Sequence, residues 1–420
     1  MSASTSQASV QQLNALSPLD YYLSIKPEAT LFNYGYQRLP NHAVDPLLIQ
    51  SREKPDFGKY MNIDIPSQGD LLHDLSLVIV LPPLQIPTGS TYVGWTNSTA
   101  FAIIETVELI VGDIAIDTRT SLDLEIFSYL STPAGSRESR DKEVNRFDTI
   151  NVLKQNALAI TTLIVPLPYS FSKKMAASLP LLSLYRQSVR LRVKFRKFDQ
   201  VVIYDGPNPP RQMSPLNVSL IAEYVHLTNV DKANFPMYGI LPGVNPSDEV
   251  KETFYLVEQV QTQVDYISPG TTTTRVQLDF RLNVKEIVFV LLDAESEANN
   301  DWFNYGRRDA AFQGGEFLIR CGLAIDGTDR FAKLPESYWR MRTTEKYHSF
   351  SGNRNIYCMS FSSAPEVNQP SGTANFSRFD SVELLLELID NVPMLKLYTF
   401  AVSYNILSIQ DGCASLQFAF

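Results

Sequence analysis

Short stretches in which apolar and polar residues alternate recur along the whole chain and constrain its fold more than any other feature. Successive side chains of a β-strand point to opposite faces, so strict alternation predicts strands with one buried face. In Val382–Leu388, for example, Glu383 and Glu387 lie on one face, and the other face is formed by Val382, Leu384, Leu386 and Leu388. The other clear examples are Tyr60–Ile65, Thr106–Val111, Val189–Phe195 and Arg275–Leu282.

The segments between these runs are rich in Pro, Gly, Ser, Thr and Asn, a composition that favours turns over helices. Helical periodicity is rare: it appears in Ser121–Leu130 and, interrupted by Pro180, in Ser172–Gln187. The 20 Tyr, 23 Phe and 25 Pro residues fit the same pattern. We therefore predict an all-β protein built from β-sandwiches with long loops and a few short helices.

The chain is long enough for more than one domain. It has 420 residues, 44% of them hydrophobic, and can bury more than one core. Residues 230–251 contain Pro and Gly and show no periodicity, which indicates a linker between two nearly equal parts. We predict a flexible Ser/Gln-rich arm at residues 1–26, one sandwich at 27–229 and a second sandwich at 252–420.

The two parts resemble each other weakly, but in the same order. The segment around Gly112 parallels the segment around Gly327, and a short helical pattern follows each. Further on, Gln187–Asp199 parallels Asp380–Asp390, and Val218–Thr228 parallels Tyr398–Ile409. Three matches in one order indicate a single sandwich that is duplicated in tandem.

Charge, cysteine content and hydropathy exclude several classes of protein. With 36 basic and 45 acidic residues, the net charge of −9 opposes a role as a nucleic-acid coat that neutralises phosphates. The three cysteines lie far apart without CxxC spacing, so a reducing compartment is expected, without a disulfide framework or a zinc site. The start of the chain shows no signal-peptide pattern, and the longest apolar run, Leu75–Leu84, is too short to span a membrane. We expect a protein that is soluble or that assembles as a soluble unit.

No catalytic or metal-binding motif is present. Nucleophile elbows, phosphate-binding loops and paired metal-binding histidines are missing from the sequence. The acidic pair Asp326 and Asp329 falls in an expected turn, and Glu383 with Glu387 falls on a solvated strand face, so neither predicts a glycosidase site. We expect no enzymatic activity, no cofactor and no metal. The four histidines are scattered: His42, His73, His226 and His348.

Three Asn-x-Ser/Thr sequons are candidate glycosylation sites, at Asn97, Asn217 and Asn375. Because no signal peptide is expected, attachment in the secretory pathway is not expected either. Asn97 is the best of the three candidates, since it falls in a loop rich in Thr, Ser and Gly.

Two basic clusters are candidate contact surfaces. The first alternates with apolar residues along one strand, and the second falls in a loop. Because the net charge is negative, we expect both to meet acidic groups of neighbouring proteins rather than nucleic acid. The clusters are Arg190, Arg192, Lys194 and Arg196, and Arg307 with Arg308.

A longer pattern carries a family resemblance. The second half contains, in order, Leu323–Trp339, Tyr357–Leu388 and Tyr398–Ile409, and its most specific block is Asn368–Asp380, "NQPSGTANFSRFD". This half resembles the C-terminal half of the major capsid proteins of nucleocytoplasmic large DNA viruses, such as iridoviruses and phycodnaviruses. Segments of the first half agree in order and spacing, so the resemblance covers the chain from about Pro27 onward.

The resemblance implies a double jelly roll with a structural role. Three copies would form a homotrimeric capsomer of pseudo-hexagonal outline, which packs with neighbouring capsomers into an icosahedral shell. The implied partners are minor capsid proteins, penton proteins and an inner membrane beneath the shell, without sequence-specific binding of nucleic acid. The implied location is the virion, with late expression and assembly in the cytoplasm of the infected cell.

Two short motifs within the resemblance are interpreted as structural elements. In the first, we expect Pro370 and Gly372 to set a turn, and Asn375 and Ser377 to satisfy its backbone groups. An ion pair in the same motif would then lock the entry into the following strand. That pair is Arg378 with Asp380, and the second motif, in an expected turn, is Asp326, Gly327, Asp329 and Arg330.

Two other classes of protein stay open. One is a β-sandwich module that binds carbohydrate or protein, as a viral surface protein or a minor capsid paralogue. Aromatic residues in loops are able to form a sugar-binding platform, and this chain has Tyr92, Trp95, Trp302 and Tyr305 in such positions. The other class, a glycosidase-like β enzyme, ranks below it. A trimer in solution favours the capsid protein, and a glycan-binding monomer favours the module.

Overall fold

The computed structural model describes residues 3–20, 24, 26, 32, 39–147, 149–232, 252–307, 315–352 and 354–418. The chain divides into two compact units, Met1–Asn41 and His42–Phe420. In the first unit, Ala3–Asn14 forms helix α1, where the composition had favoured a flexible arm. This stretch contains neither Pro nor Gly, so no residue in it breaks a helix.

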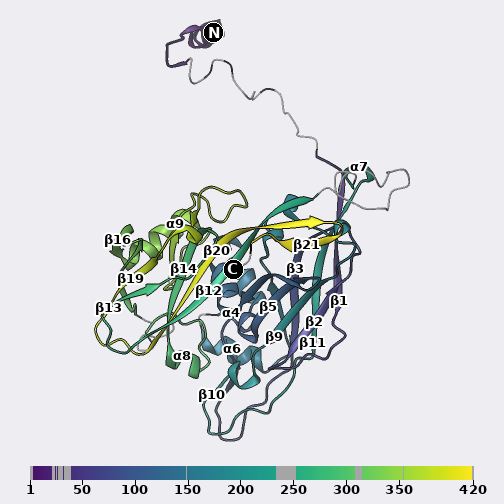
Figure 1. Ribbon diagram of the computed structural model, residues 1–420, viewed down its shortest axis with the longest axis vertical. Coiled ribbons are helices and arrows are strands. Elements are labelled where there is room, and N and C mark those ends of the chain that lie inside the picture. Colours follow the sequence, from purple (N-terminus) through teal and green to yellow (C-terminus); the bar gives the residue numbers. More distant parts are fainter. Residues whose placement is uncertain are drawn as a thin grey trace. The chain divides into compact units, whose positions relative to one another are not determined.

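The first half of the second unit is a sandwich of two antiparallel sheets (Figure 1). Sheet A has the order β1-β11-β3-β7, with the short β8 also paired with β3; sheet B has the order β2-β9-β5-β6. A two-stranded pair, β10-β4, forms sheet C. The strands are β1 (His42–Gln50), β2 (Tyr60–Ile65), β3 (Leu71–Leu81), β4 (Val93–Trp95), β5 (Ile104–Val111), β6 (Ile114–Thr120), β7 (Thr161–Pro166), β8 (Leu179–Pro180), β9 (Val189–Phe195), β10 (Val202–Tyr204) and β11 (Asn217–Leu227).

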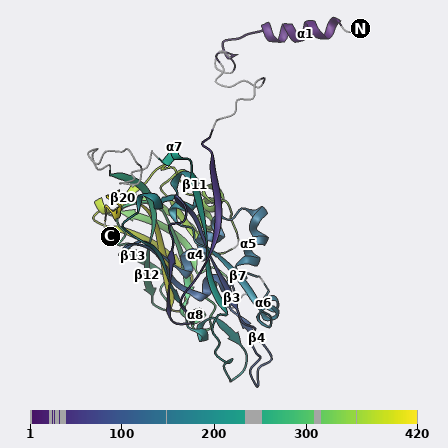
Figure 2. The same ribbon diagram turned by 90° about the vertical axis from the view of Figure 1, so that its right-hand side faces the viewer.

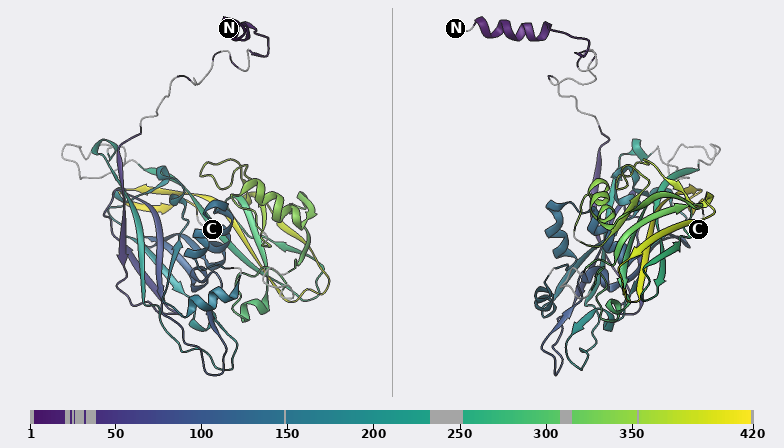
Figure 3. Two further views of the ribbon diagram at one scale, coloured as in Figure 1. Left: turned by 180° about the vertical axis from the view of Figure 1, so that it is seen from behind. Right: turned by 90° about the vertical axis from the view of Figure 1, so that its left-hand side faces the viewer.

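The second half forms another sandwich, which is seen in front in the right-hand view of Figure 3. Sheet D has the order β12-β20-β14-β17, with β18 on β14 and β21 on β20; sheet E has the order β13-β19-β15-β16. The strands are β12 (Thr253–Ile267), β13 (Thr273–Gln277), β14 (Asn283–Asp293), β15 (Leu318–Ile325), β16 (Thr328–Pro335), β17 (Tyr357–Ser360), β18 (Ala374–Asn375), β19 (Val382–Leu388), β20 (Leu395–Gln410) and β21 (Cys413–Leu416).

The two sandwiches share one topology. The strand order of sheet A, β1-β11-β3-β7, corresponds position by position to the order of sheet D, β12-β20-β14-β17. In the same way, the order of sheet B, β2-β9-β5-β6, corresponds to the order of sheet E, β13-β19-β15-β16. The predicted correspondences occupy equivalent places: the hairpin β5–β6 matches β15–β16, β9 matches β19 and β11 matches β20. Both hairpin turns contain a glycine at positive φ, Gly112 and Gly327. The predicted duplication is confirmed, and the fold is a double jelly roll.

The alternating pattern gave correct bounds for β2, β9 and β19, while β13 is shorter than predicted. The sequence pattern extends to Leu282, but β13 ends at Gln277. The backbone N–H groups of Asp279 and Arg281 donate instead to the side-chain oxygens of Gln263 (2.9 Å) and Gln261 (3.0 Å). Glutamine side chains of β12 thus replace a strand as the partner of this segment.

The helix predicted after Thr120 is present as α4 (Ser121–Ser131). Its N-terminus is capped by reciprocal hydrogen bonds between Thr120 and Asp123, an arrangement known as a capping box. The helix predicted at Ser172–Gln187 is wrong. Pro180 lacks a backbone N–H and lies in β8, which pairs with β3, so this segment forms only single turns around a short strand. The single turns are η2 (Ser170–Ser172), η3 (Met175–Ala177) and η4 (Leu181–Ser183).

The other helices are short and lie between strands. In Figure 2, α5 and α6 lie beside the strands of the first sandwich. The remaining helical segments are α3 (Thr99–Ile103), η1 (Ala134–Ser136), α5 (Arg137–Glu143), α6 (Ile150–Ala157), η5 (Phe198–Gln200), α7 (Asn229–Lys232), α8 (Ala294–Ala298), the π-helical turn η6 (Tyr338–Arg342), α9 (Thr343–Tyr347) and η7 (Phe376–Arg378).

Sheet D contributes to both hydrophobic cores. In β14, every residue from Val284 to Asp293 is buried. Ile287 and Phe289 belong to the core of the second sandwich, whereas Val288 and Val290 belong to the core cluster of the first. A strand buried on both faces is continuously apolar, and this explains the unbroken run from Ile287 to Leu292.

Truncation of Phe400 tests the importance of this doubly buried sheet. Phe400 is fully buried on the face of sheet D that meets the first sandwich, and Phe254 on β12 is 56% exposed. We expect Phe400→Ala to lower the free energy of unfolding by about 3–5 kcal/mol and Phe254→Ala to change it by less than about 0.5 kcal/mol. Chemical denaturation of both variants checks this, and equal losses would contradict it.

Candidate functional site

The junction between the two sandwiches is the first candidate site, because it fixes how the duplicated halves are joined. The face of sheet D that points away from its own core packs on α4, β6 and the segment after β7. Direct hydrogen bonds cross the junction: the backbone N–H of Phe350 donates to the Leu130 carbonyl (2.9 Å), and the Trp302 indole donates to the Gln200 carbonyl (2.8 Å). The side-chain amide of Gln259 also donates to the Ile116 carbonyl.

A buried carboxylate, Glu125 of α4, holds the junction from the side of the first sandwich. Its oxygens meet Arg146 at 3.1 Å, the Tyr305 hydroxyl at 3.0 Å and the Arg354 guanidinium. Burial opposes ionisation, but Arg354 and Arg146 lower the pKa of Glu125 below its ordinary value. Because Tyr305 and Arg354 come from the second sandwich, Glu125 is an ionic tie between the two halves.

A second tie is built around Glu258 of β12. Its two oxygens meet Lys285 of β14 at 2.7 Å and Lys173 of the first sandwich at 2.5 Å. The ammonium of Lys285 also donates to the Pro365 carbonyl (2.6 Å), and burial lowers its pKa. Lys285 is fully buried, so its charge depends on these partners.

His348 lies between two carboxylates beside the same junction. Its Nε2 is 3.3 Å from Glu286 and its Nδ1 is 3.2 Å from Glu366. Burial disfavours the charged imidazolium, but Cys358 and Glu286 outweigh burial and raise the pKa of His348 well above its ordinary value. The imidazolium is thus a structural cation in the folded protein.

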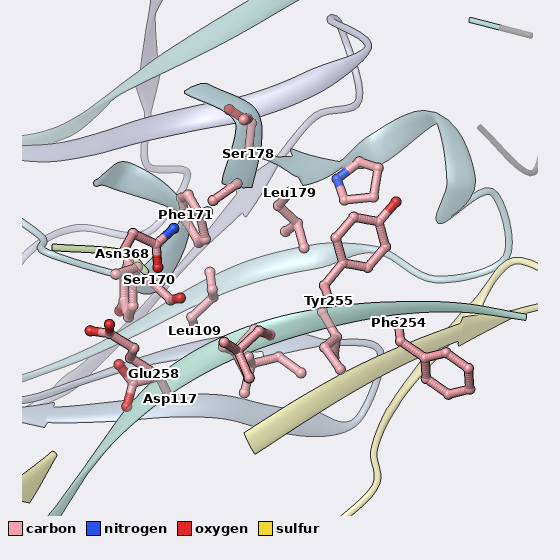
Figure 4. A pocket seen from close by; sticks show the side chains of 18 residues that line it. Leu109, Asp117, Ser170, Phe171, Ser178, Leu179, Phe254, Tyr255, Glu258 and Asn368 are labelled. Carbon is pink, nitrogen blue, oxygen red and sulfur yellow. The ribbon is translucent and has the colours of Figure 1, made fainter. Parts of the chain in front are cut away.

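A small crevice of about 230 Å³ opens where β12 meets the segment after β7. Figure 4 shows the carboxylates of Asp117 and Glu258 at one end and the aromatic rings of Phe254 and Tyr255 at the other. Burial raises the pKa of Asp117 to about 6, although Arg119 lies beside it. The crevice is part of the junction between the sandwiches.

The outer face of sheet A is the second candidate site. Its inward residues, such as Leu75 and Leu77, are buried in the core, whereas Leu48 on the outward side is 55% exposed. On the outward side, three rows of residues across the sheet are uncharged, and the adjoining row, Pro46, Glu223 and Asp74, carries two carboxylates. The rows, which define the sheet A outer face, are Leu48, Ile221, Ser76 and Pro166; Gln50, Ser219, Val78 and Ile164; and Asn217, Val80 and Thr162.

The outer face of sheet B differs, because it is charged and its charges are paired within the sheet. Arg190 lies 3.9 Å from Asp64, Lys194 lies 2.5 Å from Glu105, and Arg192 pairs with Glu108. Their first partners are therefore carboxylates of the same sheet, and the expected contact with acidic groups of another protein stays a prediction. Ion pairs of this kind contribute little to stability.

Arg196, predicted to share that face, lies elsewhere. Its side chain is buried beyond the end of β9, where it donates to the Ala102 carbonyl (2.6 Å) and stacks on the Trp302 ring at 3.7 Å. Burial lowers the pKa of Arg196 to about 10. Arg196 is thus part of the junction. In the other predicted cluster, the backbone N–H of Arg307 donates to the Gly315 carbonyl, and Arg308 lies outside the residues that the structure describes.

The sequons differ in accessibility. Asn97, expected to be the best glycosylation candidate, uses its side-chain nitrogen to donate to the Phe147 carbonyl (3.0 Å), and its oxygen accepts from the Phe147 N–H (3.0 Å). A sugar would have to attach to that nitrogen, so Asn97 is poorly suited. Asn217 and Asn375 are exposed and stay candidates.

The two structural motifs lie together. Asn375 accepts from the Ser377 N–H (3.1 Å), and the Ser377 hydroxyl accepts from the Leu282 N–H (2.9 Å). A Cβ at Gly372 would lie 2.6 Å from the Phe361 carbonyl oxygen, at a φ of +131° that favours glycine. Pro370 precedes this glycine in the same loop.

The predicted lock between Arg378 and Asp380 is wrong. Arg378 is exposed and has no ion-pair or hydrogen-bond partner among the residues that the structure describes. The entry into β19 is held instead by Asp326, whose carboxylate accepts from the backbone N–H groups of Asp380 and Ser381, both at 2.9 Å. Asp326 and Gly327 form the β15–β16 turn, both at positive φ, and Asp329 and Arg330 follow in exposed positions of β16.

The aromatic residues proposed as a sugar-binding platform do not form one. Trp95 and Tyr305 are buried, Trp302 is covered by Arg196, and the ammonium of Lys154 lies 3.5 Å from the centre of the Tyr92 ring. These residues pack the protein interior, so the geometry gives no support to a carbohydrate-binding module.

In the part of the chain that the structure describes, no group of His, Cys, Asp and Glu residues is arranged to hold a metal ion. Cys321, Cys358 and Cys413 are free thiols. None of the helices in the described residues is long and apolar enough to cross a membrane.

The sequence pattern did not lead us to predict the buried charged residues of the junction, although the sequence contains a signal for them. Lys285 and Glu286 interrupt the apolar run of β14, and Glu125 interrupts the apolar helix α4. A charged residue inside an otherwise apolar element requires a partner when it is buried. That rule could have marked these positions, but the partners come from distant segments that no local pattern identifies.

Two family models match the chain. The model described as the large eukaryotic DNA virus major capsid protein matches residues 249–415, and the model described as the major capsid protein N-terminus matches residues 30–228. The chain is 25% identical to the major capsid protein of Pyramimonas orientalis virus, over 98% of this chain and 99% of that protein. It is 24% identical to the major capsid protein of Paramecium bursaria Chlorella virus 1, with the same coverage.

Solved structures show the same architecture. The quasi-atomic model of the PBCV-1 virus capsid matches with a TM-score of 0.76 and 22% identity, over 93% of this chain and 100% of that chain. The Faustovirus major capsid protein matches with a TM-score of 0.73 and 11% identity, over 95% of this chain and 96% of that chain.

The duplicated strand order and these structures define the class by its fold: a double jelly-roll protein. Because the two family models together span both sandwiches, the chain belongs to the family of large eukaryotic DNA virus major capsid proteins. Its role is structural and not enzymatic, and its place is the capsid of the virion.

Removing the charge of Glu125 tests the ionic tie. We expect Glu125→Gln to lower the free energy of unfolding by about 3–5 kcal/mol, because Arg354 would stay buried without its counter-charge and Arg146 would keep only Asp141. Glu383→Gln is the control, since its partner Arg275 is largely exposed, and it should cost no more than about 1 kcal/mol. Equal effects in denaturation experiments would show that Glu125 is not a tie.

The pH dependence of unfolding tests His348. Its folded pKa is raised above the unfolded value of about 6.5, so its stabilising contribution is fully present below that pH and is lost as pH rises through the folded pKa. We expect His348→Gln to be less stable than wild type at pH 6 and to lose less stability on the alkaline side. A wild-type slope in His348→Gln would refute the assignment.

Proposed function

We propose that three copies of this major capsid protein form a capsomer of pseudo-hexagonal outline, and that such capsomers tile an icosahedral shell. The matching strand order of the two sandwiches supports the outline, because three chains with two similar sandwiches each present six similar units. When one surface of a protein binds a different surface of its copy, the copies form a closed ring if the rotation between them closes.

The single observation that carries the proposal is the sheet A outer face. The equivalent face of sheet D is covered by the first sandwich of the same chain, whereas the rows of sheet A are uncharged and Leu48 is largely exposed. Interface cores are depleted of charged residues, while solvated surfaces are not. The paired charges on sheet B show the contrast, because the same sandwich keeps a charged face where its strands meet solvent.

The other parts of the proposal rest on the family. Minor capsid proteins, penton proteins and an inner membrane are proposed as further partners of the shell, and late expression and cytoplasmic assembly as its origin. The proposed domain limits are residues 27–229 and 252–420, joined by residues 230–251. Most of that linker lies outside the residues that the structure describes.

Light scattering after size exclusion tests the capsomer. We expect a particle with three times the 47.3 kDa mass of the chain. Electron microscopy of the same fraction should show hexagonal outlines. A monomer at micromolar concentration would contradict the proposal.

A further inference from the structure

A pocket of about 720 Å³ opens at the surface beside Glu125, where the two sandwiches meet. The first sandwich contributes Tyr129 of α4, much of α5 and residues that follow α5, and the second contributes Phe350 and Arg354. The Glu125 carboxylate is fully buried and pairs with Arg146 and Arg354, which line the pocket. A pocket of this volume is in the size range of sites that hold small molecules.

Three guanidinium groups gather around one aromatic ring in this pocket. Among the residues that the structure describes, two carboxylates pair with all three of them, Glu125 and Asp141. One positive charge is therefore left over, although the net charge of the whole chain is −9. The arginine cluster, with guanidinium carbons 3.9 Å, 5.7 Å and 4.8 Å from the centre of the Tyr129 ring, consists of Arg137, Arg146 and Arg354, respectively.

Lys142 and Glu138 form an exposed ion pair at the rim of the pocket. The ammonium of Lys142 lies 2.7 Å from the Glu138 carboxylate, four residues earlier on α5. Both side chains are largely exposed, so the pair contributes little to stability. Their charges cancel, and the excess positive charge of the pocket therefore comes from the arginine cluster.

Arg137 is the member of the cluster with the most unused hydrogen-bond donors. Its guanidinium carbon lies 3.9 Å from the centre of the Tyr129 ring and 3.8 Å from the centre of the Phe350 ring, and cation–π attraction holds it there. A guanidinium has five N–H donors. Within the described residues, Arg137 makes one long hydrogen bond, from Nη1 to the Tyr129 carbonyl (3.4 Å), and its Nε is 3.6 Å from Asp141.

The surroundings of Arg137 oppose its charge. Burial lowers the pKa of Arg137, and the other two members of the arginine cluster lower it further by repulsion. The side chain still keeps 18% of its surface exposed, so an anion in the pocket is able to reach it. Such an anion would supply both the missing negative charge and the missing hydrogen-bond acceptors.

We propose that this pocket binds a phosphate group, either as free phosphate or as part of a phosphorylated small molecule, and that Arg137 is its main ligand. The planar fork of an arginine matches two phosphate oxygens. A phosphate group also offers more charge and more acceptor oxygens than a carboxylate, which suits three converging guanidinium groups. The pocket volume leaves room for a ligand larger than phosphate alone.

The bound phosphate would join the two sandwiches. Arg137 belongs to α5 of the first sandwich, and Phe350 and Arg354 belong to the second. A ligand that binds only the folded chain stabilises it, and the effect grows with ligand concentration. At constant ionic strength, tripolyphosphate should therefore raise the midpoint of thermal unfolding of the wild type, whereas chloride should not.

Titration calorimetry of the purified protein with orthophosphate, tripolyphosphate and ATP tests the site directly. We expect Arg137→Gln to weaken binding at least about tenfold, because it removes charge-assisted hydrogen bonds. Arg140→Gln is the matched control: Arg140 lies on the same helix, pairs with Glu143 at 2.8 Å and does not line the pocket. This control should bind like the wild type.

A second variant is expected to act in the opposite direction. Glu138→Gln removes a carboxylate from the rim and frees the ammonium of Lys142, so binding should tighten about two- to fivefold. Glu138 is largely exposed, and its replacement leaves the fold intact. Tighter binding cannot result from a folding defect, so this variant decides the question if Arg137→Gln does not fold.

The three probes also distinguish the two sources of phosphate. Equal affinity for orthophosphate and tripolyphosphate indicates free phosphate, whereas tighter binding of tripolyphosphate and ATP indicates a phosphorylated small molecule; both results support the site. It is overturned if none of the probes binds at millimolar concentration, if Arg137→Gln and Arg140→Gln bind equally well, or if only a glutamate-rich peptide binds. Every residue of the site belongs to one chain, so these outcomes do not depend on the number of copies in the capsomer.

Discussion

The burial of sheet D on both faces is the interaction on which the rest of the structure depends. One face closes the core of the second sandwich, and the other closes the surface of the first. A sheet that is buried twice cannot shift relative to either neighbour without exposing apolar side chains, and each buried side chain of this size contributes about 1.5–3 kcal/mol. The two sandwiches therefore behave as one body, although each has the complete topology of a separate domain.

Apolar contact alone does not determine how two faces are oriented, and the buried ions at the junction supply that information. Glu125 reaches Arg354 and Tyr305 only when the first sandwich meets the second in one position, and Glu258 reaches Lys173 under the same condition. Such pairs add little net stability, because desolvation offsets their attraction, but a misplaced pair leaves a buried charge without a partner. We interpret these ion pairs as interactions that favour a single relative orientation of the two sandwiches.

Much of the fold could be predicted from local pattern. The alternation in β2, β9 and β19 gave their bounds, and the tandem repeat gave the duplication. The pattern failed where side chains from another strand took over the backbone bonds, as Gln261 and Gln263 do after β13. It also failed for Arg196 and Arg378, since the sequence shows that a residue is charged but not which group lies opposite it. The candidate site was predicted least well, because the sheet A outer face combines residues from four strands, and single-strand patterns do not show which side of a sheet is left uncovered.

The fusion of two sandwiches into one chain also bears on how a ring of six would form. Six separate sandwiches would have to meet in five successive encounters, each with its loss of translational and rotational freedom, whereas three double chains need two. The remaining three contacts form during folding, where the linked halves are always at high effective concentration. In the proposed capsomer, a chain with a defective Glu125 cluster would hold its two sandwiches at the wrong relative orientation and would fail to close a ring. Half of the contacts in such a ring would thus be checked by the folding of single chains before any two subunits meet.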